Sequence, residues 1–283
     1  MPNAYFLLFE FIIYIQFALC LRHAWTQRPA GVLRLLFGAA FGVLLELATI
    51  RQLNAYEYGR FLFMVLDVPL CIGVAWGCIV YSAMEFSDAS DLPFWARPAL
   101  DGLLALNIDL ALDAVTIRLG FWDWGQGLDF QYFGVPFANF WAWFWVVFWF
   151  SLGHRLLSRR TDWVGTWLSA PLGLTLGLAG VLGTNFLISF IVPFAYHGLT
   201  VVIAIAAPLL FIFFLKPRFN VRPAPSLVFW VPFIAHAYLL IAGLISGVIL
   251  NPPFLLIVGL TMVAVAFYLH RPFLQKSFVK NSA

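Results

Sequence analysis

The chain has 283 residues, of which 63% are hydrophobic and only 10% charged, and its formal net charge is +3. A soluble domain carries about 25% charged residues, so the composition excludes a soluble protein and indicates a membrane protein. The basic residues lie between apolar runs, and we therefore expect no nucleic-acid partner. Cys20, Cys71 and Cys78 lie within apolar runs without CxxC spacing, which indicates small core residues and not a disulfide framework.

Nine apolar segments are long enough to span a bilayer as a helix, which takes about 17–25 residues. They cover residues 4–21, 32–50, 61–84, 99–118, 137–153, 165–192, 196–215, 227–250 and 253–270. Pro193 marks either a turn between two of them or a kink in one longer helix. The sequence predicts an all-α polytopic membrane protein, with residues 1–283 forming a single bundle of nine transmembrane helices, or eight if the Pro193 region is one element.

The basic residues are divided unequally between the two sides of this bundle. Of the 16 lysines and arginines, only Arg51, Arg60 and Arg118 follow even-numbered segments. The others follow odd-numbered segments or lie in the C-terminal tail, which carries Lys276 and Lys280. The positive-inside rule therefore predicts an N-terminus outside the membrane and a C-terminus in the cytoplasm.

Four of the acidic residues within the predicted helices lie near the outer side. Glu46 lies about one turn from the outer end of the second segment, and Asp67 lies in the outer half of the third. Asp109 and Asp113 lie within about three turns of the outer end of the fourth segment, and they share a helix face because residues four apart are neighbours. Acids inside a membrane are rare and are functional candidates by default.

Two close carboxyl groups in a low dielectric cannot both ionise cheaply, so at least one should keep its proton near neutral pH. Such a pair supplies a general acid beside a base. Asn139, Asn185 and His197 are predicted at the same depth. The structural alternative is that these side chains only join helices by hydrogen bonds, but four acids and two amides at one depth favour a functional cavity.

Aromatic residues are dense in the loop 119–136 and in the helix that follows it. The loop carries Trp122, Trp124 and Tyr132, which form either an interfacial aromatic belt or a lid over the acids. The helix contains the stretch NFWAWFWVVFWF, which either packs against lipid and other helices or forms a wall that stabilises a cation. His154 and His236 are isolated, and without HExxH, CxxCH or a GxGxxG in context we expect no metal, haem or nucleotide cofactor.

The run DLALDAVTIRLGFWDWGQG, followed by YFGVPFANFWAW, resembles the CruF-type integral-membrane carotenoid hydratases, which include γ-carotene hydratases and bisanhydrobacterioruberin hydratase. The similarity covers about residues 40–145. The matching residues are Glu46, Asp67, Pro69, Trp76, Tyr81, Asp109, Asp113, Trp122, Trp124, Tyr132, Gly134, Pro136, Asn139 and Trp143. Ala114 and Ala142 depart from the family pattern, which has Pro and Gly there, and this leaves the substrate and the reaction open.

The resemblance implies addition of water to a terminal C=C of a carotenoid or other long isoprenoid, without a cofactor, in a bacterial or archaeal cytoplasmic membrane. This chemistry needs an acid, a base for water and groups that stabilise a tertiary cation. We expect Asp109 or Asp113 to be the acid, with its partner, Asp67 or Glu46 handling water. The expected substrate-binding residues are Trp76, Tyr81, Trp122, Trp124, Tyr132, Asn139, Trp143 and Asn185.

Two other functions share parts of this pattern. A membrane terpene cyclase would begin with the same protonation but capture the cation with an internal alkene. A proton-coupled transporter would also carry intramembrane acids. The sequence shows no convincing inverted repeat, and its acids lie on one side instead of at the midplane, which favours an enzyme. A structural scaffold would leave the acids unexplained.

Overall fold

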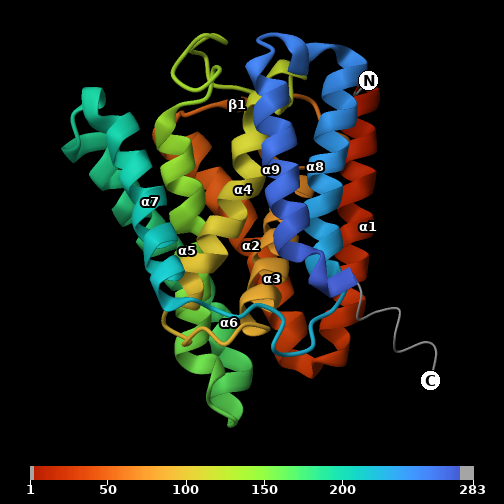
Figure 1. Ribbon diagram of the computed structural model, residues 1–283, viewed down its shortest axis with the longest axis vertical. Helices are drawn as coiled ribbons and strands as arrows, with labels where there is room; N and C mark the ends of the chain where they lie inside the picture. Colours follow the sequence, from red (N-terminus) through yellow and green to blue (C-terminus); the bar gives the residue numbers. More distant parts are fainter. Residues whose placement is uncertain (1–2, 275–283) are drawn as a thin grey trace.

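The computed structural model describes residues 3–274, except the side chains of 52 and 53, and shows an upright bundle of helices (Figure 1). Its α-helices are α1 (Ala4–Thr26), α2 (Arg28–Leu53), α3 (Leu70–Asp88), α4 (Arg97–Arg118), α5 (Phe137–Ser158), α6 (Trp163–Phe186), α7 (His197–Leu215), α8 (Leu227–Ser246) and α9 (Phe254–His270). Short elements are β1 (Glu57–Tyr58), β2 (Met64–Val65), β3 (Val68–Pro69), β4 (Trp122–Asp123), the π-helical turn η1 (Leu187–Ile191) and the 3₁₀ turns η2 (Phe194–Tyr196) and η3 (Val248–Leu250). We call the end at which α1 begins the upper end, as in Figure 1.

The predicted all-α polytopic bundle is confirmed, with nine α-helices within residues 3–274. The region around Pro193 holds two helices, because α6 ends in η1 and α7 begins only at His197. Six of the helices (α1, α2, α3, α6 with η1, α7 with η2, and α8) are long and apolar enough to cross a membrane. Lys276 and Lys280, which entered the charge count, lie outside the described residues.

The predicted start of the third helix at residue 61 is wrong, because α3 begins at Leu70. Residues 64–69 form the small antiparallel hairpin of β2 and β3 instead. Its turn needs a left-handed backbone at Leu66, where φ is 57°. Pro69 then disfavours a helical conformation at the preceding residue, so the helix can begin only after it.

Helix α4 lies in the centre of the bundle, which explains how a membrane protein can contain three aspartates in one helix. It packs against α3, α5, α7, α8 and α9, and in Figure 1 it stands between α5 and α9. Asp101, Asp109 and Asp113 are at most 2% exposed. The acids of α4 therefore face protein, and no charged group has to be placed in lipid.

Helices α2 and α3 approach each other closely through two glycine pairs with GxxxG spacing. A Cβ atom on Gly42 would lie 2.5 Å from the Trp76 Cβ and 2.9 Å from the Gly73 carbonyl oxygen. A Cβ on Gly38 would lie 3.3 Å from the Gly77 Cα. Small residues at this spacing let membrane helices pack backbone to backbone. This contact brings Trp76 of α3 against the upper half of α2.

Replacing Gly42 with alanine should destabilise the bundle, whereas the same change at Gly183 should not. The new methyl group at Gly42 has to displace Trp76 or the α3 backbone, and overpacking of this kind costs about 1–3 kcal/mol. A Cβ on Gly183 meets nothing within 4 Å. The midpoint of thermal unfolding in detergent should fall for Gly42→Ala and stay level or rise for Gly183→Ala; equal midpoints would contradict the close contact.

Candidate active site

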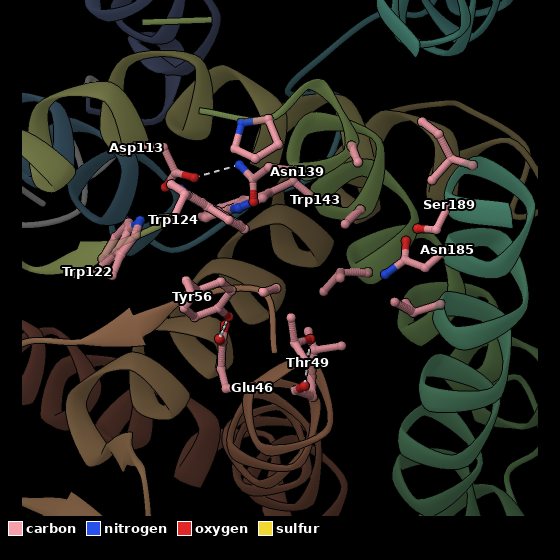
Figure 2. Close-up of a pocket in the computed structure, with 18 of the residues that line it drawn as sticks. Glu46, Thr49, Tyr56, Asp113, Trp122, Trp124, Asn139, Trp143, Asn185 and Ser189 are labelled. Carbon is pink, nitrogen blue, oxygen red and sulfur yellow. Dashed lines mark hydrogen bonds between the residues drawn. The ribbon is translucent and has the colours of Figure 1, made fainter. Parts of the chain in front are cut away.

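A cavity of about 570 Å³ lies at the upper end, among α2, α3, α4, α5 and α6 and beneath the two upper loops (Figure 2). Its walls are mostly apolar and aromatic. Polar side chains enter it from several elements: Glu46, Thr49, Tyr56, Tyr58, Asp113, Gln126, Gln131, Asn139, Asn185, Ser189 and His197. A large apolar cavity with a few convergent polar groups is the usual form of a binding site for a small molecule.

Glu46 of α2 is the centre of one polar group in this cavity. The carboxyl is 5% exposed and is bonded by three neutral donors. Trp76 donates its Nε1–H to Oε1 at 2.8 Å, and the Tyr58 hydroxyl donates to Oε2 at 2.8 Å. The Tyr56 hydroxyl also donates to Oε2. The three donors satisfy both oxygens of this carboxyl without a cationic partner.

The two tyrosines are held over Glu46 by the pairing of the upper loops. Tyr58 of β1 pairs with Trp122 of β4, and the Gly59 amide donates to the Phe121 carbonyl at 2.8 Å. Burial, and then the nearby Glu46 carboxylate, raise the pKa of Tyr56 and of Tyr58 well above the usual value for a phenol. Both hydroxyls therefore remain protonated and act as donors.

Asp109 and Asp113 form the second polar group. The Asn139 amide Nδ2 donates to Oδ2 of Asp109 at 3.0 Å and to Oδ2 of Asp113 at 2.5 Å. Asn139 stands in the first turn of α5, so the start of that helix places the amide against α4. The two carboxyl groups lie side by side because one nitrogen bridges them. Only Asp113 lines the cavity, and Asp109 lies behind it, fully buried.

Tryptophans form much of the cavity wall. The rings of Trp76 and Trp143 lie 4.3 Å apart between centroids, beside Glu46. Trp124 packs edge-on against Tyr56 at 4.6 Å, and Trp122 against Tyr58 at 5.9 Å. The loop 119–136 thus contributes to the cavity itself. Electron-rich ring faces surround a space that also holds two carboxyl groups.

The far wall is built by α6 and its π-helical end. Asn185 and Ser189 project into the cavity across from Asp113 (Figure 2). Phe190 and Phe194 also line it and are 69% and 64% exposed. The π-helical turn η1 follows the end of α6 at this level, and π-turns often occur at functional sites. The cavity therefore reaches an apolar outer surface of the bundle.

Three of the residues predicted for the site lie elsewhere. Asp67 lies in the exposed hairpin turn and pairs with Arg51 at 2.8 Å, where both side chains are 55% exposed. Tyr81 lies in the second half of α3, where its hydroxyl meets His23 Nδ1 at 2.9 Å. Tyr132 donates its hydroxyl to the Leu110 carbonyl at 2.9 Å and does not line the cavity.

The structure adds residues that the sequence analysis did not select. Tyr56 and Tyr58 are the clearest, and the only local signal was their alternation in the polar segment NAYEYG. Thr49, Gln126, Gln131 and Ser189 also line the cavity. Of the two positions that depart from the family pattern, Ala142 lines the cavity, whereas Ala114 is 1% exposed and lies outside it.

Asn139 and Asp67 should differ sharply in their contribution to stability. Asn139→Leu removes the donor of two buried carboxyl groups, and an unsatisfied buried group costs about 1–3 kcal/mol. Asp67→Asn removes one exposed ion pair, worth at most about 1 kcal/mol. A denaturant titration in detergent measures the free energy of unfolding of both variants. An equal loss of this free energy in the two variants would contradict the bridging of Asp109 and Asp113 by Asn139.

Comparison with known proteins identifies the family. The model of the carotenoid biosynthesis protein family matches residues 3–214, which include every element of the cavity. No curated protein and no solved structure gave a match. The match extends beyond the 40–145 region on which the resemblance was based and confirms it. The chain belongs to the carotenoid biosynthesis protein family and has the helices of a multi-pass membrane protein.

Proposed function

We propose that the protein is a cofactor-independent hydratase that adds water to a terminal C=C of a carotenoid or another long isoprenoid. One observation carries the proposal: among the described residues, the acids of the upper cavity are bonded by neutral donors and by no arginine or lysine. Buried acids at the lower end are all paired with arginine, as Asp101 is with Arg155. A carboxyl group without a cationic partner is free to take up and release a proton.

Asp113 is the proton donor in this proposal. It is the member of the aspartate pair that lines the cavity, so its carboxyl can reach a bound alkene. With Asp109 beside it in an apolar site, ionising both groups is costly and one proton is retained. Asp109 touches Asn139 and not the cavity, so it acts as a positioning residue that holds this proton on the pair.

The reaction balances without an added reagent. The Asp113 proton forms a new C–H bond at the less substituted alkene carbon, which leaves a tertiary cation. The oxygen of a water molecule bonds to that cation, and the water proton passes to the Glu46 carboxylate. The proton then returns to Asp113, and the net product is a tertiary alcohol. General acid and base catalysis of this kind supplies about 10²–10⁴-fold each.

The cavity supports a cationic intermediate. The Trp76 and Trp143 rings lie next to Glu46, and Trp122 and Trp124 close the upper side. Aromatic faces attract a cation within about 6 Å of the ring centroid, with an energy that grows when water is excluded.

A lipophilic substrate would reach the site from the membrane. Exposed Phe190 and Phe194 lead from the cavity to the outer surface beside η1, so one end of a long polyene can enter while the rest stays in lipid. The distribution of lysine and arginine among the loops supports an upper end on the outer side of the cytoplasmic membrane, with the N-terminus outside. Gln126, Gln131 and His197 provide polar contacts for water near the loops.

Replacing Asp113 with asparagine should lower turnover by about 10²–10⁴-fold, because the amide cannot protonate an alkene. Asp67→Asn is the matched control and should keep near wild-type activity, since Asp67 lies outside the cavity. Pigments are analysed by mass spectrometry after co-expression with a lycopene or γ-carotene pathway. Full activity of a folded Asp113→Asn protein would refute the assignment.

Isotope labelling separates hydration from cyclisation. In H₂¹⁸O the hydratase should place one ¹⁸O atom in each new hydroxyl group, because the oxygen comes from solvent. A cyclase would give a product of unchanged composition and without the label. A protein that moves protons in liposomes, yet alters no polyene, would be a transporter and not an enzyme.

A further inference from the structure

A second cavity, of about 470 Å³, is lined by residues of the connections at the lower end of the bundle, which is the end opposite the start of α1 (Figure 1). It forms where the α3–α4 connection, the end of α5 and the α7–α8 connection meet. Its charged lining consists of four arginines and two aspartates, a formal excess of two positive charges: Arg97, Arg155, Arg159, Arg222, Asp88 and Asp91.

Only part of this positive charge is neutralised. Asp88 accepts from Arg97 at 2.7 Å and is also bonded by Arg155. Arg159 and Arg222 are exposed and, within residues 3–274, have no carboxylate partner. The Arg159 guanidinium lies 4.3 Å over the Phe94 ring, which restrains it. The cavity thus presents two uncommitted guanidinium groups.

The cavity is built by backbone contacts between the two connections. The amides of Val221 and Arg222 donate to the Ala89 carbonyl at 2.9 and 3.1 Å. The Arg218 amide and Nε both donate to Asp91 at 2.8 Å. These bonds hold the α7–α8 connection against the α3–α4 connection. Arg222 is therefore placed by the fold and not by a free loop.

A buried histidine in the same cavity lacks a hydrogen-bond partner. His154 is 6% exposed and lines the cavity. Its Nδ1 has no partner among the described residues. A buried polar atom that stays unsatisfied costs free energy, and native proteins rarely leave one without a ligand or another partner. The His154 ring itself lies in the cavity wall, where an oxygen-rich anion would be an acceptor for a ring N–H turned toward it.

We propose that this cavity binds a phosphate group, with Arg159 and Arg222 as its charged partners and His154 as a further donor. Guanidinium groups match the geometry of phosphate oxygens. Trp95 and Trp163, at the same end, are 52% and 64% exposed, as expected of residues at a membrane interface. The headgroup of an anionic lipid reaches this level from the membrane, and free phosphate reaches it from the water.

The test uses the full chain purified in neutral detergent, with phosphatidylglycerol, phosphatidylcholine or inorganic phosphate added at constant ionic strength. Phosphatidylglycerol should raise the midpoint of thermal unfolding. Native mass spectrometry should show that the double variant Arg159→Gln/Arg222→Gln binds phosphatidylglycerol about tenfold more weakly than the wild type. The reason is that each interfacial arginine contributes substantially to anionic-lipid binding. Both side chains are exposed, so this variant should fold.

The control Arg160→Gln/Arg271→Gln removes the same charge at the same end. Arg160 pairs with exposed Asp162, and Arg271 lies over the Tyr268 ring. This control should bind phosphatidylglycerol as strongly as the wild type and should show the same rise in the midpoint of thermal unfolding. Protection by phosphatidylglycerol alone identifies a lipid headgroup, and protection by inorganic phosphate identifies a free-phosphate site. Equal binding by the two double variants, equal protection by phosphatidylcholine, or no protection by either phosphate source would overturn the proposal.

Discussion

A carboxyl group removed from water must find its hydrogen-bond donors inside the protein, and three buried acids in and behind the cavity wall impose this demand on the upper half of the bundle. Glu46, Asp109 and Asp113 are each at most 5% exposed. Their donors come from an α3 tryptophan, an α5 asparagine and two tyrosines of the first upper loop. The position of α5 against α4, and the folding of both upper loops over the cavity, therefore serve the same requirement.

The two ends of the molecule meet this requirement in different ways. At the lower end, Glu85 pairs with Arg34, and Asp101 with Arg155. At the upper end, the donors are amide, indole and phenol groups, which satisfy the oxygens without supplying a positive charge. Ion pairs lock a carboxylate in its charged form, whereas neutral donors leave both protonation states accessible. Ion pairs thus join the helices at the lower end, whereas the upper end satisfies its acids without a cation, as the proposed proton transfer requires.

Helix packing makes this arrangement compatible with a membrane. The polar helix α4 is surrounded by other helices, while lipid-facing α7 exposes a largely apolar surface. The GxxxG contact between α2 and α3 then sets the distance between Glu46 and Trp76, because both residues lie within about one turn of the glycines. Bulkier residues at Gly42 would separate the acid from its donor. The chemistry of the site depends in this way on residues without functional groups.

Hydropathy and loop charge are properties of short stretches of chain. Hydropathy predicted the nine helices, and loop charge predicted that Glu46, Asp109 and Asp113 lie at one level. The spacing of four residues put Asp109 and Asp113 on one face of their helix. Local pattern placed Asn139 and the tryptophans near those acids as well. It did not locate Asp67, because a left-handed turn at Leu66 and the proline that follows moved it from the helix into an exposed ion pair. Nor did it identify Tyr56 and Tyr58 as the donors of Glu46, since a loop reaches its partners only through pairing with a distant loop, here β1 with β4. Which donor meets which acid was decided by the tertiary structure, because hydrogen bonds form between atoms a few ångströms apart in space, whatever their separation along the chain.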